Sequence, residues 1–203
     1  MNRTENATFR KEGEGWGAQN RSAVAVWVGR KDRKPGKDLE AEGTRRLPRT
    51  TAHRTGMDIT WLTDRIAVGG GIWTRDNMAK VAQAGITHII DMQIEFDDTP
   101  LAVDHGIEVL WNPTDDDFEA KPAELFRRGV DFAVKALDGG DGKLFIHCAA
   151  GVHRAPMMAL ALLGTMGWDV GDAMDLIETR RPVADFAEVY VRSVEEFLDG
   201  SGE

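Results

Sequence analysis

The fold of this 203-residue chain is indicated most clearly by one stretch of its sequence, His147-Cys148-Ala149-Ala150-Gly151-Val152-His153-Arg154-Ala155-Pro156. The segment 143–146 before it, a lysine followed by three apolar residues, is typical of a buried strand, and the apolar segment 156–166 after it is typical of a helix. In sheets covered by helices, ligands bind at the carboxyl ends of strands. We therefore expect a binding loop between the strand and the helix.

Strand and helix patterns alternate on either side of this stretch. We expect strands at 59–62, 65–68, 86–92, 107–111 and 143–146. We expect helices at 76–84, 122–137, 156–166, 170–179 and 187–198. Strands separated by helices predict an α/β fold with a mostly parallel sheet between layers of helices.

Charge divides the chain into two parts. Residues 1–56 hold 13 Lys and Arg against 7 Asp and Glu, a net charge of +6, whereas residues 57–203 have a net charge of −15. The first part has little apolar periodicity, so we interpret 1–56 as a basic, disordered N-terminal segment. It is either an unstructured leader or an arm that docks an anionic partner. Residues 57–203 are predicted to form the one folded domain.

Composition excludes several classes of protein. Hydrophobic residues make up 42% of the chain and charged residues 29%, as in soluble globular proteins. No apolar run approaches the roughly 18 residues needed to cross a membrane. The single cysteine excludes an internal disulfide and a multi-cysteine zinc site. We therefore expect a cytoplasmic protein with no metal and no cofactor. The net charge of −9 argues against a nucleic-acid or membrane partner.

The residues of the loop point to chemistry on an anion. Backbone N–H groups entering a helix converge on one spot, and the helix dipole favours negative charge there. Gly151 permits a tight turn, and the planar guanidinium of Arg154 matches two phosphate oxygens. These positive groups would stabilise Cys148 as a thiolate, a nucleophile able to attack phosphorus. The alternative is that Cys148 is merely a small buried residue, which leaves the surrounding pattern unexplained.

This segment resembles the signature His-Cys-x5-Arg of the cysteine-based protein tyrosine phosphatases, and most closely that of the dual-specificity phosphatase family. The likeness covers roughly residues 59–199. It implies a central mixed sheet of about five strands flanked by helices, with Cys148 as nucleophile and Arg154 as phosphate clamp. It also implies that His147 tunes the thiolate and that substrate phosphate is bound by the loop backbone of Ala149, Ala150, Gly151, Val152, His153 and Arg154.

The resemblance further implies a general acid on a loop about thirty residues before the cysteine. Three adjacent aspartates lie there, and we favour Asp116, followed by Asp117 and then Asp115. At least one of them is expected to be a solvated residue that caps the next helix. The earlier pair, Asp97 and Asp98, is expected to serve as turn or cap residues.

Three other features of the sequence keep alternatives open. His153 either touches substrate or faces solvent, and the pair 180–181 either binds a second anion or simply ends a helix. Position 155 is Ala where most relatives have Ser or Thr, whose hydroxyl assists breakdown of the phosphoenzyme. Plant glucan phosphatases of the same branch also have Ala at this place.

The sequence therefore predicts a metal-independent phosphatase that acts on phosphotyrosine or phosphoserine/threonine proteins. Alternatives are a phosphatase of glucan or another non-protein substrate and a phosphate-binding pseudophosphatase. Rhodanese-like sulfur transfer and arsenate reduction fit less well: rhodanese-like proteins generally lack the upstream acid loop that this sequence has, and arsenate reduction usually needs a resolving cysteine, which this sequence lacks.

Overall fold

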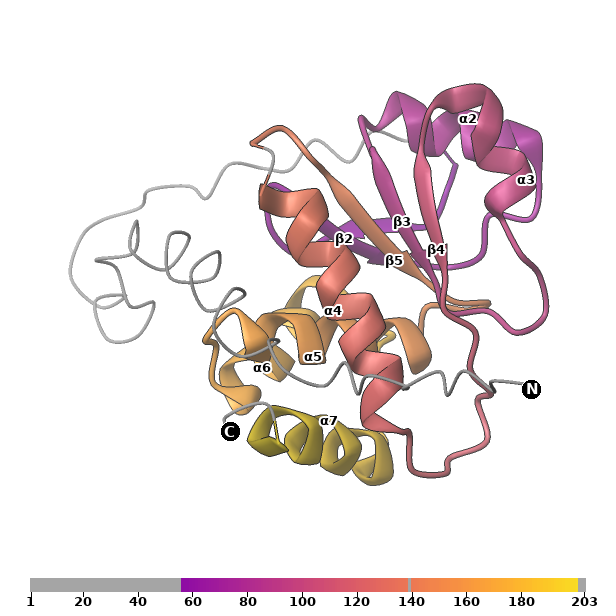
Figure 1. Ribbon diagram of the computed structural model, residues 1–203. Coiled ribbons are helices and arrows are strands. Elements are labelled where there is room, and N and C mark those ends of the chain that lie inside the picture. The colour runs from indigo at the N-terminus through magenta and orange to yellow at the C-terminus, as the bar shows by residue number, and fades with distance from the viewer. Residues whose placement is uncertain (1–55, 139, 201–203) are drawn as a thin grey trace, which may run out of the picture.

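The computed structural model describes residues 56–138 and 140–200. The predicted N-terminal segment 1–56 thus lies outside the described residues, except for Gly56. The described part is an α/β fold with a central sheet and helices on both faces (Figure 1).

The sheet has five strands, in the spatial order β1-β2-β5-β3-β4. The first strand is antiparallel to the second, and all other neighbours are parallel. The prediction of a mixed, mostly parallel sheet is therefore confirmed. The strands are β1 (Ile59–Trp61), β2 (Ile66–Gly69), β3 (His88–Asp91), β4 (Glu108–Trp111) and β5 (Leu144–His147).

Helices cover the two faces unequally (Figure 1). One face carries the smaller apolar core and the short elements α2 (Arg75–Gln83), α3 (Thr99–Ala102) and the 3-10 turn η1 (Val103–His105). The other face carries the larger core and α4 (Ala123–Asp138), α5 (Arg154–Thr165), α6 (Val170–Arg180) and α7 (Glu188–Gly200).

Helix α5 is the centre of the larger layer. Its first ten residues are all buried, and it contacts α4, α6 and α7 as well as β5. A helix that is apolar on all sides requires neighbours on all sides, and this sequence supplies them. Because β5 is the middle strand and α5 the middle helix, the loop between them is anchored at both ends by the core.

Two details differ from the sequence prediction. Helix α5 begins at Arg154, two residues before the predicted start at 156. Proline is tolerated within the first helical turn because its missing N–H would have no partner there. The short helix α3 and the turn η1 were not predicted, because seven residues are too few to show a helical period.

The contact between α4 and α7 provides a test of the larger core. Phe126 is fully buried, and its ring centroid lies 5.5 Å from that of Phe197. We expect Phe126→Ala to lower the free energy of unfolding by about 3–5 kcal/mol, because it leaves a cavity. Urea unfolding followed by tryptophan fluorescence measures this change. Val103→Ala, at a position 73% exposed, is the control and should unfold like the parent protein.

Candidate active site

The loop after β5 lies at the carboxyl end of the sheet, as predicted. Cys148 follows the strand directly, and its side chain is 1% exposed. Its backbone N–H donates to the carbonyl of Gly69 at 3.4 Å, and the N–H of Gly71 donates to the carbonyl of Ala149 at 3.0 Å. The segment after β2 therefore holds the beginning of the loop.

The loop curls around the cysteine sulfur. The N–H of Gly151 donates to Sγ of Cys148 at 3.2 Å. Gly151 has φ +65°, and a Cβ there would lie 2.3 Å from Nη2 of Arg181 and 2.5 Å from the carbonyl oxygen of Gly69. Only glycine combines this backbone conformation with such close neighbours. The turn thus directs an N–H donor at the sulfur.

Arg181 supports the outside of the loop. Its side chain is 3% exposed, and Nε donates to the carbonyl of Gly151 at 2.6 Å while Nη2 donates to that of Ala150 at 3.2 Å. Asp58 pairs with the same guanidinium at 2.8 and 2.6 Å, and this hydrogen bonding lowers the pKa of the carboxyl. The pair 180–181 does end helix α6, as one sequence alternative had it, with Arg181 as the C-cap residue. The side chain of Arg181 is in addition a buried support of the loop.

Arg154 is the buried cation of the site, with a side chain 3% exposed. Glu95 accepts from Nη1 and Nη2 at 2.9 and 2.8 Å, and the carbonyl of Thr114 also accepts from Nη1 at 3.0 Å. The hydrogen bonds from Arg154 lower the pKa of Glu95. Within the described ranges, Nε of Arg154 has no hydrogen-bond partner. The guanidinium is thus fixed in place, and of its five N–H donors the Nε–H and one Nη2–H have no acceptor among the described residues.

The three candidate aspartates are placed differently. Asp116 approaches the loop, with Oδ2 3.0 Å from Nδ1 of His153 and 4.0 Å from Nε of Arg154. Asp117 instead pairs with Lys121, whose hydrogen bond lowers the pKa of this carboxyl. Asp115 is exposed, and no hydrogen bond joins it to the loop in the part of the chain that the structure describes. Of the three, Asp116 alone meets the loop.

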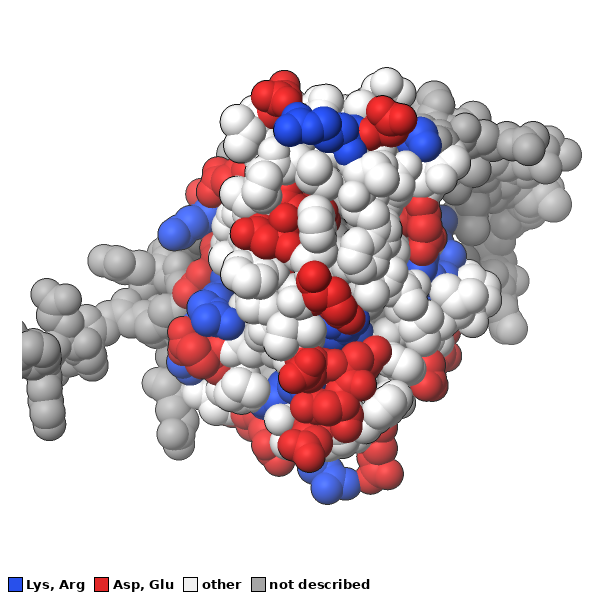
Figure 2. Space-filling model, turned by 90° about the vertical axis from the view of Figure 1, so that its right-hand side faces the viewer, with Lys and Arg blue, Asp and Glu red and all other residues white. Residues whose placement is uncertain are grey.

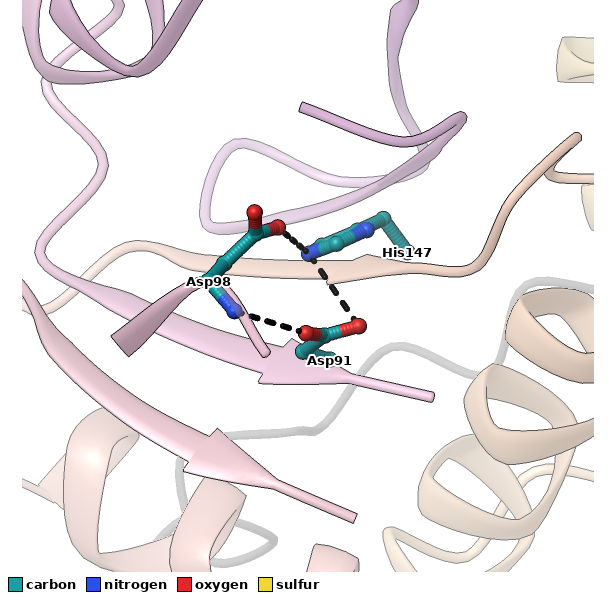
Figure 3. A group of neighbouring side chains, drawn as sticks. All are labelled: Asp91, Asp98 and His147. Carbon is teal, nitrogen blue, oxygen red and sulfur yellow. Dashed lines mark hydrogen bonds and ion pairs between the residues drawn. The ribbon is translucent and has the colours of Figure 1, made fainter. Parts of the chain in front are cut away.

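A buried group of three titratable side chains lies behind the loop (Figure 3). Nε2 of His147 lies 3.1 Å from Oδ2 of Asp98 and 3.7 Å from Oδ1 of Asp91, and all three side chains are fully buried. Asp98 does occupy the N-cap position of α3, as expected for a cap residue, but its side chain makes no cap hydrogen bond and faces the imidazole instead. Asp97 does form the expected turn, accepting from the N–H of Thr99.

The same group has the composition of a metal site. One ligand atom from each of Asp91, Asp98 and His147 lies within 4.8 Å of the others, and no other such group occurs among the described residues. An imidazolium offsets only one of two carboxylate charges, so a group of this composition without an ion is neutral only when one carboxyl is also protonated. Burial raises the pKa of Asp91 to about 6, against the attraction of His147, which lowers it.

Several contributors were missed by sequence reasoning. Glu95 and Tyr190 reach the site from segments about 60 and 40 residues away from the loop, and their sequence neighbourhoods show no motif. Tyr190 donates to Oδ1 of Asp116 at 3.2 Å. The sequence did single out the segment around Arg181, but only the fold reveals which carbonyl groups it meets.

The face that carries the strand ends is markedly acidic (Figure 2). Asp and Glu side chains gather near its middle, with a basic side chain partly visible beneath them. Asp115, Asp117 and Glu119 are exposed members of the loop between β4 and α4. The positive groups that could hold an anion are therefore local and buried, while their surroundings are negative.

A family model described as the dual specificity phosphatase catalytic domain matches residues 72–199. The chain belongs to the dual specificity phosphatase family. This match confirms the resemblance drawn from the loop, and it covers strands β3, β4 and β5, the acidic loop and the larger helical layer.

Similar curated proteins of this phosphatase family differ in what their names say they act on. The chain is 26% identical over 144 residues to the amyloplastic phosphoglucan phosphatase DSP4 of Castanea sativa, covering 65% of this chain and 38% of that protein. It is 34% identical over 74 residues to dual specificity protein phosphatase 5 of Rattus norvegicus, covering 36% and 19%. The chain thus spans less than half the length of these relatives.

Solved structures of the family share the fold. PTPMT1 in complex with PI(5)P gives a TM-score of 0.64 at 18% identity, covering 71% of this chain and 96% of that one. DUSP15 gives a TM-score of 0.62 at 23% identity, covering 71% of this chain and 90% of that one.

In neither of the described ranges is there a helix long and apolar enough to cross a membrane.

The raised pKa of Asp91 predicts how stability depends on pH. An acid whose pKa is higher in the folded than in the unfolded state stabilises the fold at low pH, and this contribution is lost as pH rises from about 4 to about 6. Because Asn does not titrate, we expect Asp91→Asn to remove the decrease in stability that the parent shows between about pH 4 and 6. The free energy of unfolding of the variant, relative to the parent, should therefore rise between pH 4 and 6 and stay level above.

Urea unfolding at a series of pH values measures this difference. A constant offset is also expected, because the amide nitrogen of Asn cannot accept a hydrogen bond from a backbone N–H as Asp91 now does from those of Gln93 and Asp98. The control is Asp64→Asn, at an exposed position, which should follow the parent at every pH. A difference for Asp91→Asn that does not vary with pH would contradict the assignment.

Proposed function

We propose that this protein hydrolyses phosphomonoesters without a metal ion, through a cysteinyl-phosphate intermediate. The observation that supports this most strongly is the loop itself, in which the Gly151 N–H donates to the sulfur of Cys148 beside the buried guanidinium of Arg154. This combines a nucleophile with an anion site at the start of a buried helix.

In the first step Cys148 attacks phosphorus as a thiolate. The S–P bond forms while the P–O bond to the leaving group breaks, and Arg154 with the loop N–H groups stabilises the phosphoryl oxygens. Arg154 holds the phosphate through its Nε–H and the Nη2–H that Glu95 does not take. Asp116 gives its proton to the leaving oxygen, because of the three aspartates it alone contacts the loop.

In the second step water attacks the phosphoenzyme. Asp116, now a carboxylate, takes a proton from water as the new P–O bond forms and the S–P bond breaks. The thiolate of Cys148 leaves and inorganic phosphate is released, which restores both residues to their starting states. Ala155 is fully buried at the start of α5 and offers no hydroxyl to the departing sulfur.

The preferred substrates are phosphorylated proteins, at tyrosine or at serine and threonine. The acidic face supports this choice, because it repels a ligand with several phosphates more than one with a single phosphate. A glucan is the second candidate: Ala155 matches the glucan phosphatases, and one similar protein is named a phosphoglucan phosphatase. The likeness to PTPMT1 extends to the fold alone, so we do not favour a phosphoinositide.

Replacing the nucleophile tests the mechanism. We expect Cys148→Ser to lower the release of phosphate from an aryl phosphate by about 10⁴-fold or more, because the hydroxyl is a far weaker nucleophile. Release by the parent should not change when a chelator is added. A parent protein that binds phosphate or vanadate but releases none from aryl, peptide or glucan phosphates would indicate a pseudophosphatase and overturn the proposal.

The residue after Arg154 tests which step is slow. We expect the parent to show a burst of phenol release followed by a slower steady state, because nothing assists the departing thiolate at position 155. Ala155→Ser should raise the steady-state rate about tenfold, the value of one hydrogen bond to a charged group, and reduce the burst. Stopped-flow absorbance with an aryl phosphate measures both phases. A steady-state rate unchanged by Ala155→Ser would show that a different step is slow.

A further inference from the structure

His153 lies between two carboxylates that come from different segments. Its Nδ1 is 3.0 Å from Oδ2 of Asp116, in the loop between β4 and α4, and its Nε2 is 3.2 Å from Oδ2 of Asp185, in the loop between α6 and α7. The imidazole is 19% exposed, and the ring of Phe118 meets it edge-on with centroids 5.0 Å apart. Of the two sequence alternatives for His153, the solvent-facing one does not describe this position.

The number of protons shared by His153, Asp116 and Asp185 follows from their contacts. Each contact needs one hydrogen between nitrogen and oxygen, so the three groups together hold two protons. In one arrangement His153 is an imidazolium between two carboxylates. In the second, Asp116 is protonated and donates to Nδ1, while the Nε2–H donates to Asp185. In the third, Asp185 is protonated and the Nδ1–H donates to Asp116. The first two arrangements differ only in whether His153 or Asp116 holds one proton.

Other contacts fix the carboxyl of Asp116 in this position. Its Oδ1 accepts from the hydroxyl of Tyr190 at 3.2 Å, and this hydroxyl in turn accepts from the N–H of Phe118 at 2.9 Å. The rings of Phe118 and Tyr190 stack with centroids 5.8 Å apart. The charged or titratable groups that face Asp116 are thus His153, Arg154 and Tyr190, while Asp185 faces it only through His153.

We propose that His153 is a positioning residue that holds Asp116 over the loop and shares the proton that Asp116 gives to the leaving group. Asp185 holds the second ring nitrogen and so keeps one proton on Nε2. This deepens the proposed function and rests on it. In the first step the O–H bond of Asp116 breaks as the new O–H bond of the leaving group forms. In the second step the proton from water returns to the pair formed by Asp116 and His153.

The dependence on leaving group tests this role. A phenol that leaves readily needs no proton, whereas a poor leaving group depends on the general acid. We expect His153→Ala to lower kcat by about 10–100-fold for an aryl phosphate with a poor leaving group and to change it little for one with a good leaving group. His105→Ala, at an exposed position far along the chain, is the control for both substrates.

The pH profile separates proton sharing from simple support. In the parent, the alkaline limb of kcat for the poor leaving group should follow loss of a proton from the combined group, and His153→Ala should move that limb to lower pH by about one unit or more. In His153→Asn, the side-chain amide replaces Nδ1 as a hydrogen-bond donor to Asp116, but it cannot exchange the proton. We therefore expect it to restore part of the rate at the optimum and not the alkaline limb.

Direct observation of the ring provides a readout that does not depend on turnover. In full-length Cys148→Ser protein, nitrogen NMR of the imidazole reports the protons on Nδ1 and Nε2 of His153. We expect Asp116→Asn and Asp185→Asn each to change the pH at which this ring titrates, and His105 to titrate as before.

The outcomes distinguish the two proposals. If the parent releases phosphate through Cys148 but His153→Ala slows both substrates equally, or leaves the alkaline limb in place, proton sharing by His153 is overturned and the proposed function stands. If the ring titration is unaffected by Asp116→Asn, the sharing is overturned independently of activity. If Cys148→Ser does not abolish release, the proposed function fails, and the ring titration alone then decides whether the contact exists.

Discussion

The curled loop depends above all on Arg181. A loop that directs its N–H groups toward one anion must turn carbonyl groups the other way, and buried carbonyls need donors. Arg181 supplies them, with one guanidinium bound to the carbonyls of Gly151 and Ala150 on one side and to Asp58 on the other. This contact joins the start of the domain, the loop and the end of α6. Removing it would leave buried carbonyl groups and Asp58 without their partner, which costs more than the loss of the bonds themselves.

Around this support, each buried cation is balanced by a more exposed carboxylate. Arg154 faces Glu95, whose side chain is 44% exposed, and Arg181 faces Asp58, at 53%. These pairs keep the arginines fixed, and Arg154 retains Nε, which has no partner among the described residues, for a phosphate. This explains how a domain with a strongly negative charge can hold a local site for phosphate: at contact distance, fixed donors outweigh the distant field.

Many features of the site could be predicted from the loop sequence, because they depend on neighbours in the chain. The order Cys148, Gly151, Arg154 between a strand and a helix places a nucleophile, a turn and a cation within one short loop. The choice of Asp116 over Asp115 and Asp117 could not be settled in this way. That choice depends on two contacts: Lys121 forms an ion pair with Asp117, and the hydroxyl of Tyr190 in the last helix donates to Asp116. The burial of Asp98 likewise follows from its meeting with His147, which no local pattern encodes.

The sequence by itself determined the fold class, the positions of the five strands along the chain and the loop that bears the chemistry. These features depend on hydrophobic periodicity and on short spacings, which relate residues that are close in the chain. Only the tertiary structure decided which distant side chains complete the loop. Glu95 reaches the loop from the segment after β3, and Arg181 and Asp185 reach it from the segment between α6 and α7. Burial and the need to satisfy hydrogen bonds select their partners. These interactions join residues that lie tens of positions apart in the chain. The contacts can therefore be read from the packed structure and not from any one sequence motif.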